Sequence, residues 1–341
     1  MSEIFYYLTF FCFTLIISFY LNGYINKLFI GNKLTDPVNE RSSHKYPATR
    51  SGGISVFLTI CLACAFGVST GKLTIPLYAL LSVFFVTLTG FIDDLITVRY
   101  REKLFLQLFA AILMFQSGYS IDSFHGVFNI YEIPWWLEVV VSLFVFVVVV
   151  NSLNLIDGLD GMASFISMKF FLIVGGIILI SKSEWFLFFP IIISALLGFL
   201  WFNFNRNKKV FLGDTGSLFI GALMAFFIFY LLDSNSSLVT DPLISRPLLA
   251  VLLLLYPLAD TLRAFLIRAW NNKSPFVADR VHLHHRLADK GYFHWQASVL
   301  TFCLSLLITA INFLLFSTIG LIGCVVLTSV LLIVFFYIFF K

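Results

Sequence analysis

Acidic and amide side chains gather at the boundaries of several long apolar runs. Asp93 and Asp94 stand together at the end of one run, and Asp214 lies just before the start of another. Asn154 and Asp157 close a third run, inside the sequence NSLNLIDGLDG. Carboxylate and amide oxygens are ligands that suit Mg²⁺, and paired carboxylates also suit acid–base work. These residue types therefore predict a metal or proton-transfer site, provided that the fold brings the segments together.

Each of these acids also has a purely structural interpretation. Asp93 and Asp94 could pair with the bases that follow them, of which Lys103 is the last. Asp214 could be a helix N-cap, and the Asn154–Asp157 segment could be a polar cap on a helix end. The spacing of Asn154 and Asp157 by three residues places them on one face if that segment is helical.

Basic side chains cluster in two further segments. The first, DPVNERSSHKYPATRSGG, contains His44 and Arg50 and ends in small residues that can open a helix and leave backbone N–H groups for an anion. The second, SPFVADRVHLHHRLADKGYFH, contains a dense group of His and Arg: Arg280, His282, His284, His285 and Arg286. Zinc binding is the alternative for the His residues, but His and Arg together favour phosphate. Both segments could also be basic loops that only set membrane topology.

Composition sets the class of protein. Of 341 residues, 60% are hydrophobic and 12% are charged, whereas a soluble domain is about half apolar and about a quarter charged. This excess of apolar residues requires lipid as a solvent. The period-2 alternation of a membrane barrel is absent, so we expect an all-α polytopic membrane bundle. No loop is long enough for a soluble domain, and residues 1–341 are expected to form one integral membrane domain.

Apolar runs predict about eleven membrane spans. They are Ile4–Asn22, Gly53–Ser69, Ile75–Asp93, Leu104–Tyr119, Trp136–Leu153, Ala163–Ile180, Trp185–Phe202, Ser217–Leu232, Leu248–Trp270, Ala297–Phe316 and Ile319–Phe340. One alternate set of loops carries about fifteen Lys and Arg, and the other set carries about three. The basic set, residues 25–50, 94–103, 154–162, 203–216 and 271–296, is predicted to be cytoplasmic. The N-terminus is then periplasmic and the C-terminus cytoplasmic.

The acidic and basic motifs all fall in the predicted cytoplasmic loops. Acidic groups for a divalent cation and basic groups for phosphates would therefore meet at one membrane face. An ion-coupled transporter would instead carry its acids near the middle of the bilayer, in broken helices. The pattern predicts a cytoplasmic-face site for Mg²⁺ and a phosphorylated water-soluble ligand.

The motifs, in their order, resemble the polyprenyl-phosphate N-acetylhexosamine-1-phosphate transferase family, glycosyltransferase family 4. The matching pieces are the stretch from Pro37 to Gly53, the Asp93–Asp94 pair, NSLNLIDGLDG, FLGDTGS and HLHHR. Within the family, the HLHHR motif is similar to that of the branch that starts O-antigen, enterobacterial common antigen or teichoic acid linkage units. The peptidoglycan branch carries three consecutive His at this place. The family pattern D-D-x-x-D departs here, because Thr97 stands at its third acidic position.

The resemblance implies a UDP-N-acetylhexosamine donor, GlcNAc by default, an undecaprenyl phosphate acceptor, and Mg²⁺ or Mn²⁺ as cofactor. It implies catalytic roles for the motif carboxylates, metal ligation by two residues, and donor or phosphate contacts by the others. The catalytic group is Asp93, Asp94 and Asp157; the metal ligands are Asp214 and Asn154; the substrate-binding group is Asp160, Lys103, Arg50, His44, Arg280, His282, His284, His285 and Arg286.

The resemblance also implies a multi-pass protein of the bacterial cytoplasmic (inner) membrane, with its site on the cytoplasmic face. Membrane lipid is an expected partner, a homodimer is consistent with the family, and no nucleic acid is expected. Two rival functions stay open at this point. One is phospho-MurNAc-pentapeptide transfer in peptidoglycan synthesis, and the other is ion-coupled transport.

Overall fold

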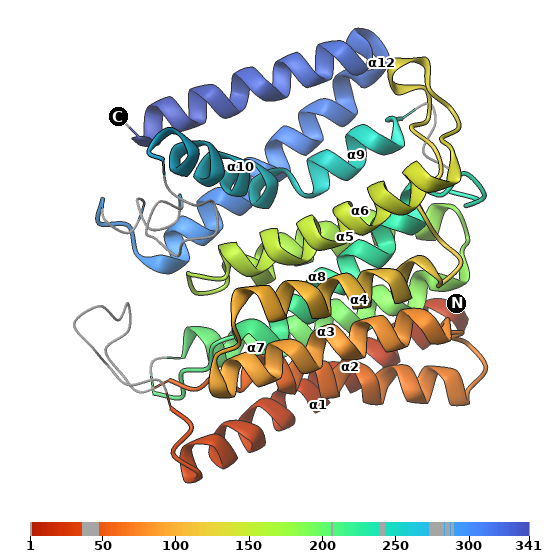
Figure 1. The fold of residues 1–341 in the computed structure, drawn as a ribbon. Coiled ribbons are helices and arrows are strands. Elements are labelled where there is room, and N and C mark those ends of the chain that lie inside the picture. The colour runs from red at the N-terminus through yellow and green to blue at the C-terminus, as the bar shows by residue number, and fades with distance from the viewer. Residues whose placement is uncertain are drawn as a thin grey trace.

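A computed structural model describes residues 2–35, 48–205, 207–238, 243–272, 283, 287 and 290–340. Over these residues the chain forms helices and no strands, with one isolated bridge between Thr49 and Val210. Most of the long helices run roughly parallel or antiparallel to one another (Figure 1). The predicted all-α class is confirmed for the described part of the chain.

The helices follow one another with short connections. In chain order they are α1 Ser2–Gly31, α2 Gly52–Ser69, α3 Leu77–Ile96, α4 Tyr100–Phe115, η1 Val127–Asn129, α5 Trp135–Ile156, α6 Met162–Ile180, η2 Glu184–Leu187, α7 Phe188–Phe204, α8 Gly213–Leu232, α9 Arg246–Leu253, α10 Leu255–Trp270 and α12 His294–Phe340. Among the described residues, eight helices are long and apolar enough to cross a membrane. The count is nine if α9 and α10, which meet at a bend of 72°, form one span.

Two helices explain why this count is lower than eleven. α4 has 16 residues, too few to pass as a span by length. α12 is continuous for 47 residues but contains Gly320 with φ of 65°, a conformation that breaks a helix. The Asn312 side chain donates to the Thr328 hydroxyl at 2.9 Å, although residues 16 apart on a straight helix lie about 24 Å apart. α12 therefore doubles back as two arms (Figure 1), and the number eleven stays a prediction.

Several helices extend beyond the apolar runs. α1 continues to Gly31, α3 to Ile96 and α5 to Ile156, so the predicted loop ranges 25–50, 94–103 and 154–162 begin too early. Hydropathy detects the part of a helix that contacts lipid, whereas backbone hydrogen bonds continue into the polar region. As a result, Asp94 and Asn154 are carried on helices rather than on loops.

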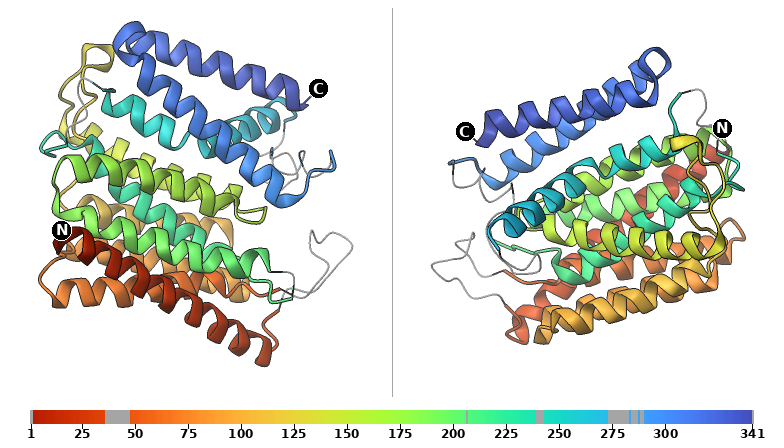
Figure 2. Two further views of the ribbon diagram at one scale, coloured as in Figure 1. Left: turned by 180° about the vertical axis from the view of Figure 1, so that it is seen from behind. Right: turned by 45° about the horizontal axis from the view of Figure 1, so that its top comes forward.

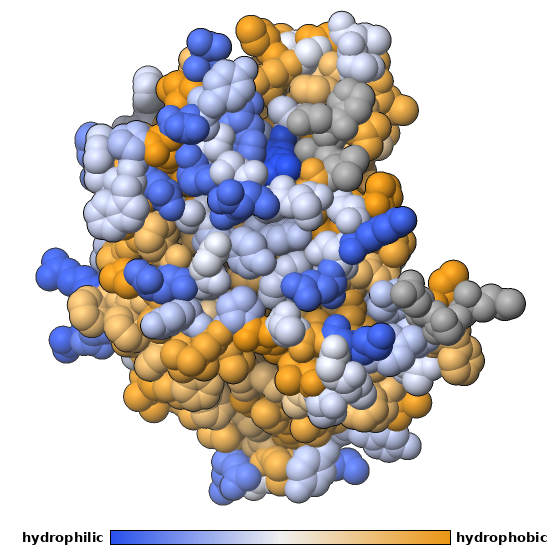
Figure 3. All heavy atoms as spheres, turned by 90° about the vertical axis from the view of Figure 1, so that its right-hand side faces the viewer, coloured by the Kyte–Doolittle hydropathy of each residue, from blue (hydrophilic) through white to orange (hydrophobic). Residues whose placement is uncertain are grey.

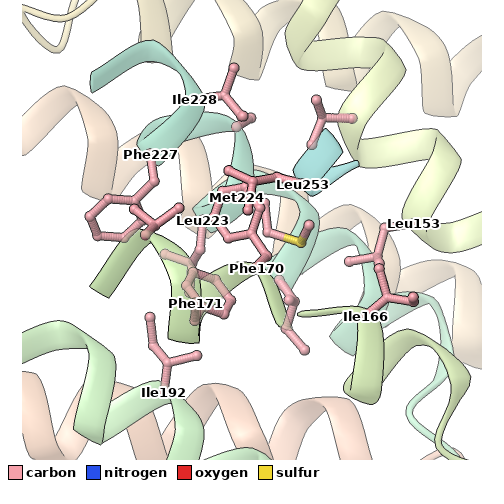
Figure 4. Close-up of a cluster of buried hydrophobic side chains, with 14 of the residues drawn as sticks. Leu153, Ile166, Phe170, Phe171, Ile192, Leu223, Met224, Phe227, Ile228 and Leu253 are labelled. Carbon is pink, nitrogen blue, oxygen red and sulfur yellow. The ribbon is translucent and has the colours of Figure 1, made fainter. Parts of the chain in front are cut away.

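α8 is the central helix of the bundle. Every residue from Thr215 to Leu232 is buried, and α8 contacts α2, α3, α5, α6 and α9. A helix that is apolar on all sides buries its whole circumference in the interior. Figure 4 shows part of the resulting core, in which Phe170 of α6 packs with Leu223 and Met224 of α8 and with Leu253 of α9.

The helix ends that carry the acidic motifs lie at the same end of the bundle. The start of α2, the ends of α3 and α5 and the start of α8 lie at one end of the bundle, away from the N-terminus (Figures 1 and 2). Figure 3 shows the opposite end, where hydrophilic side chains gather over the middle of the face and hydrophobic side chains dominate below it. The acidic motifs found in the sequence therefore share the first end.

The contact of α3 with α8 depends on Gly90. A Cβ atom at this position would lie 2.4 Å from the Asp214 carbonyl oxygen, whereas a Cβ at Gly176 of α6 would meet nothing within 4 Å. We expect Gly90→Ala to lower the free energy of unfolding by about 1–3 kcal/mol through overpacking. Gly176→Ala should leave it unchanged or raise it by up to about 1 kcal/mol through helix propensity.

Thermal unfolding of the purified variants in one detergent measures this difference. Equal melting temperatures for the two alanine variants would contradict the close approach of α3 and α8.

Candidate active site

The Asp94 carboxylate joins the end of α3 to the start of α8. It accepts hydrogen bonds from the backbone N–H groups of Asp214 at 3.0 Å and Thr215 at 2.9 Å, and from the Thr215 hydroxyl at 2.6 Å. The first N–H groups of a helix have no partner within the helix and favour negative charge. The Asp94 side chain is only 2% exposed. α8 is therefore capped by a carboxylate from another helix.

Gly213 allows this close contact. Its φ of +68° is a left-handed conformation, and a Cβ there would lie 2.7 Å from Asp94 Oδ2. A side chain would collide with the capping carboxylate and strain the backbone. Arg50 Nη1 lies 3.7 Å from Asp94 Oδ1 and is partly exposed, so it adds a positive charge at the same junction.

Asp93, Lys103 and Asp214 form the charged centre of the site. The Lys103 ammonium contacts Asp93 Oδ2 at 3.0 Å and also contacts Asp214 Oδ2. The carboxylates of Asp93 and Asp214 lie within hydrogen-bonding range of each other. Two carboxylates at such a distance repel unless a proton or a cation lies beside them. Lys103 supplies that cation here, and its position shows where positive charge is stabilised.

Asp93 has different hydrogen-bond partners from its neighbour Asp94. Its Oδ1 accepts from the backbone N–H of Val98 at 2.5 Å, which fixes the turn between α3 and α4. Thr97, in the position of the third family acid, lies exposed in that turn with φ of 53°. Asp93 is more exposed than Asp94, at 14% against 2%. Of the two adjacent acids, Asp93 is thus the one that a ligand can reach.

Asn154 and Asp157 approach the start of α8 from the end of α5. Asn154 Nδ2 donates to the Ser217 hydroxyl at 2.9 Å, and Ser217 donates to the Gly213 carbonyl at 2.9 Å. Asp157 accepts a hydrogen bond from the Gly213 backbone. Burial, reinforced by the negative charges of nearby carboxylates including Asp214, raises the pKa of Asp157 well above its usual range. A divalent cation in this region would oppose that effect.

The donor set fits a magnesium ion that also binds substrate. Among the described residues, no three His, Cys, Asp or Glu side chains form a ready-made metal cage. Mg²⁺ is commonly held by one or two carboxylates together with water and substrate phosphates. Asp214 offers a carboxylate, and the contact of Asn154 with Ser217 leaves its amide oxygen available as an acceptor. These two residues are consistent with an ion completed by a phosphorylated ligand.

Asp160 belongs to a second group beside this centre. Its carboxylate pairs with Lys209 Nζ at 2.6 Å and lies 3.7 Å from His294 Nδ1. Although burial alone would raise it, these two partners hold the pKa of Asp160 below its usual range. Lys209 also lies 5.7 Å from the centre of the Phe211 ring. The group brings a charged pair and an aromatic face together next to FLGDTGS.

The structure thus brings together eight of the residues that the sequence predicted. They are Arg50, Asp93, Asp94, Lys103, Asn154, Asp157, Asp160 and Asp214. The other six lie outside the described residues: His44, Arg280, His282, His284, His285 and Arg286. Their roles stay predictions.

Sequence reasoning missed several residues that hold the site. Thr215, Lys209 and His294 had no assigned role, although each contacts a predicted acid. Lys209 lies two residues before FLGDTGS, so its nearness to a motif was a usable signal. His294 begins α12, and only the packing of α12 against α6 brings it to Asp160.

Comparison with known proteins gives an independent result. The family described as Glycosyl transferase family 4 matches residues 76–232, which hold α3 to α8. The chain is 29% identical over 274 residues to "Probable undecaprenyl-phosphate N-acetylglucosaminyl 1-phosphate transferase" of Bacillus subtilis (strain 168), covering 76% of this chain and 71% of that protein.

Two further relatives carry similar names. "Decaprenyl-phosphate N-acetylglucosaminephosphotransferase" of Mycolicibacterium smegmatis is 27% identical over 323 residues, with 84% of this chain and 76% of that protein covered. "Undecaprenyl-phosphate alpha-N-acetylglucosaminyl 1-phosphate transferase" of Escherichia coli (strain K12) is 27% identical over 287 residues, with 82% and 76% covered. The similarity therefore extends well beyond the residues of the motifs.

The two adjacent acids should differ in what their loss does to stability. Asp94→Asn places an amide against the N–H groups of α8, so we expect a loss of about 1–3 kcal/mol, the scale of an unsatisfied buried group. Asp93→Asn keeps an oxygen for the Val98 N–H and should cost clearly less. Melting temperatures of the two variants, measured side by side, check this order. A larger loss for Asp93→Asn would mean that Asp94 does not cap α8.

Proposed function

Because the chain belongs to glycosyl transferase family 4, as its motifs predicted, we propose that it transfers N-acetylhexosamine-1-phosphate from a UDP-sugar to undecaprenyl phosphate. GlcNAc-1-phosphate is the transferred group that the names of the relatives favour. The product would be a lipid-linked diphosphate sugar that starts a cell-envelope polysaccharide. The observation that carries the proposal is the convergence of Asp93, Asp214 and Lys103 at helix ends.

The reaction is a single displacement at phosphorus. A phosphate oxygen of the acceptor forms a bond to the β-phosphorus of the UDP-sugar, and the bond from that phosphorus to the bridging oxygen of UMP breaks. UMP leaves with the electron pair of this bond. A phosphate monoester is largely ionised near neutral pH, so the attacking oxygen needs no strong base. The main barrier is to bring two anions together.

The residues of the chain meet this barrier with positive charge and fixed geometry. Lys103 reaches both Asp93 and Asp214, and a phosphate entering beside them would find the same ammonium. Arg50 is partly exposed at the junction and can contact the acceptor phosphate. Asp94 keeps the start of α8 in place and is a positioning residue. Asp93, the more accessible acid, is proposed to orient the attacking phosphate.

Asp214 and Asn154 are proposed to hold Mg²⁺, for which Mn²⁺ can substitute. The bound ion would neutralise the diphosphate and the charge that builds up on the leaving UMP. Asn154 is oriented for this role by its bond to Ser217. Asp157 accepts from the backbone of Gly213, the first residue of α8, and is proposed to support the helix start that presents Asp214.

The donor nucleotide is proposed to lie toward Asp160. The Lys209–Asp160 pair and the Phe211 ring supply charged and aromatic contacts next to the central acids. Arg280, His282, His284, His285 and Arg286, together with His44, complete the proposal as contacts for the donor phosphates and sugar. They come from segments that the motifs predict to be on the same membrane face.

The proposed topology has eleven spans in the bacterial inner membrane. The N-terminus would be periplasmic, and the site and the C-terminus cytoplasmic. The two termini lie at opposite ends of the bundle (Figure 1), as an odd number of crossings requires. The two arms of α12 and the short α4 would supply the spans beyond those that length alone identifies.

A transport function fits the structure less well. The acids of this site lie in the last turn of α3 and the first turn of α8, at the ends of spans. Ion-coupled transporters place such groups near the middle of the bilayer. Phospho-MurNAc-pentapeptide transfer, the peptidoglycan reaction, differs from the proposed reaction only in its nucleotide-sugar donor. An assay that compares the two nucleotide sugars therefore decides between these two reactions.

Turnover by the purified protein tests the proposal directly. Protein in detergent is incubated with undecaprenyl phosphate, Mg²⁺ and one of several donors: UDP-GlcNAc, UDP-GalNAc or UDP-MurNAc-pentapeptide. We expect UMP release with UDP-GlcNAc that requires the lipid and stops with EDTA. Release with UDP-MurNAc-pentapeptide alone would overturn the branch, and no release with any donor would overturn the function.

The Asp214 side chain should be essential for turnover but not for folding. Its backbone N–H, not its carboxylate, makes the bond to Asp94. We expect Asp214→Asn to reduce UMP release by at least about 10²-fold, the scale of losing one charge-stabilising group, with little change in melting temperature.

Asp122→Asn is the matched control. Asp122 lies at the other end of α8, where it accepts from the Ser234 backbone N–H. It should keep full turnover. Near-normal turnover of Asp214→Asn at saturating Mg²⁺ would contradict the metal assignment.

A further inference from the structure

Lys169 is a buried lysine that the proposed chemistry does not use. It lies in α6, about two helical turns after Met162, and its side chain is 1% exposed. Its neighbours in the chain, Met168 and Phe170, are apolar. An ammonium inside a membrane bundle is costly unless polar groups surround it. Its retention there therefore requires a partner.

The partners come from two other helices. Lys169 Nζ donates to the backbone carbonyl of Leu252 in α9 at 2.9 Å and to the Ser305 hydroxyl of α12 at 2.6 Å. Among the described residues, no carboxylate forms an ion pair with it. The ammonium is thus stabilised by hydrogen bonds to two neutral oxygens and not by a carboxylate.

The Leu252 carbonyl belongs to the last turn of α9, where the chain bends by 72° into α10. Pro257 contributes to the bend, because it has no N–H to offer the carbonyl of Leu253, the residue after Leu252, and its ring crowds that carbonyl. The Leu252 carbonyl accepts one backbone N–H at the C-terminal cap of α9, and its second lone pair and the partial negative charge of the helix end remain for a further donor. Lys169 supplies both a donor and a positive charge at this point.

α12 reinforces the same contact. The Thr309 hydroxyl, one helical turn after Ser305, lies 3.4 Å from the Leu252 carbonyl oxygen, a longer contact than its bond to the Ser305 carbonyl at 2.7 Å. Lys169 of α6 and Thr309 of α12 therefore approach the same carbonyl. The last turn of α9, next to the carbonyl that Pro257 leaves without its usual partner, is therefore held by side chains from α6 and α12.

The bend decides where α10 goes. α10 packs against α5, whose end carries Asn154 of the candidate site. Within α10, the fully buried Asp260 carboxylate accepts the backbone N–H of Leu283 at 2.8 Å. Leu283 is the second residue of HLHHR, the motif proposed to contact the donor. A change in the direction of α10 would therefore move Leu283.

We propose that Lys169 is a positioning residue for donor binding, because its ammonium fixes the α9–α10 bend and the bend places Leu283. The kinetic part of this inference rests on the proposed function. Lys169 would not touch the reacting groups. Its loss should weaken binding of the UDP-sugar and leave binding of the lipid acceptor and the chemical step nearly unchanged.

Kinetics of Lys169→Met test the functional consequence. Methionine has a similar length and no charge, so the core stays filled while the hydrogen-bond donor of Lys169 is lost. We expect KM for the UDP-sugar to rise roughly tenfold, the scale of one lost hydrogen bond to a charged group, with kcat and KM for undecaprenyl phosphate within about twofold. Leu172→Met, on the exposed face of the same helix, is the matched control and should change nothing.

Lys169→Gln is the conservative variant. It keeps an N–H donor for the Leu252 carbonyl but carries no charge, so KM for the UDP-sugar should recover at least partly. An unchanged KM for the UDP-sugar in Lys169→Met would overturn the proposal. A loss confined to kcat would overturn it as well.

Hydrogen exchange tests whether Lys169 fixes the α9–α10 bend, and it needs no activity assay. In wild-type protein and Leu172→Met, we expect slow exchange at the backbone N–H groups of Leu254, Leu255, Tyr256 and Leu258. In Lys169→Met these should exchange at least about tenfold faster, while those of the buried α8 do not change. Unchanged exchange at the bend would overturn the inference, even if KM moved.

If Lys169→Met cannot be recovered folded, Lys169→Gln and Thr309→Val take its place in both measurements. Thr309→Val removes the longer contact with the same carbonyl and should loosen the bend to a smaller degree. No change in exchange in either variant would overturn the inference. If the wild-type protein releases no UMP, the proposed function fails, while the exchange measurement still decides the role of Lys169 at the bend.

Discussion

The contact between the Asp94 carboxylate and the start of α8 is the constraint on which the site depends. α8 is buried along its length, so its first N–H groups cannot rely on water and need a partner from the protein. The end of α3 provides it, with three hydrogen bonds to one carboxylate. The same contact sets Asp93 beside Asp214, since each is adjacent in the chain to a residue of the junction. One structural contact therefore creates the pair of carboxylates that needs a cation.

At the start of α8 and at the end of α9, a charged side chain from another helix bonds to backbone groups, and the two charges are opposite. At the start of α8, unpaired N–H groups bond to a carboxylate, and at the end of α9 the Leu252 carbonyl, which also accepts a cap N–H, bonds to the ammonium of Lys169. In both cases a side chain from another helix serves backbone groups at a helix end inside a membrane bundle. In the first case the arrangement builds the proposed catalytic centre. In the second it sets the direction of α10, whose Asp260 accepts the backbone N–H of Leu283.

The fold class and the central acids could be predicted from the sequence, because hydropathy and carboxylates at the ends of apolar runs are local signals. The different roles of Asp93 and Asp94 could not, since they depend on which carboxylate faces α8 across the α3–α8 contact. Helix ends were misplaced because polar residues such as Asn154 continue a helix outside the lipid-like region. Lys169 was missed although a lysine within an apolar run is itself a signal. Its role could not be predicted, because it depends on the contact with the Leu252 carbonyl at the bend after α9.

The central proposal is that the acid-bearing helix ends form one site at the cytoplasmic face of the membrane. Labelling with a membrane-impermeant maleimide tests it most directly, in a variant whose five native cysteines are replaced by alanine. Single cysteines are placed at Thr97, Gly158 and Asn207, which are exposed in the connections next to Asp94, Asp157 and Asp214, and at Tyr131, which is exposed at the opposite end. The account predicts that the first three react only in inside-out vesicles and Tyr131→Cys only in right-side-out vesicles. Reaction of any of the three from the same side as Tyr131→Cys would contradict a shared site.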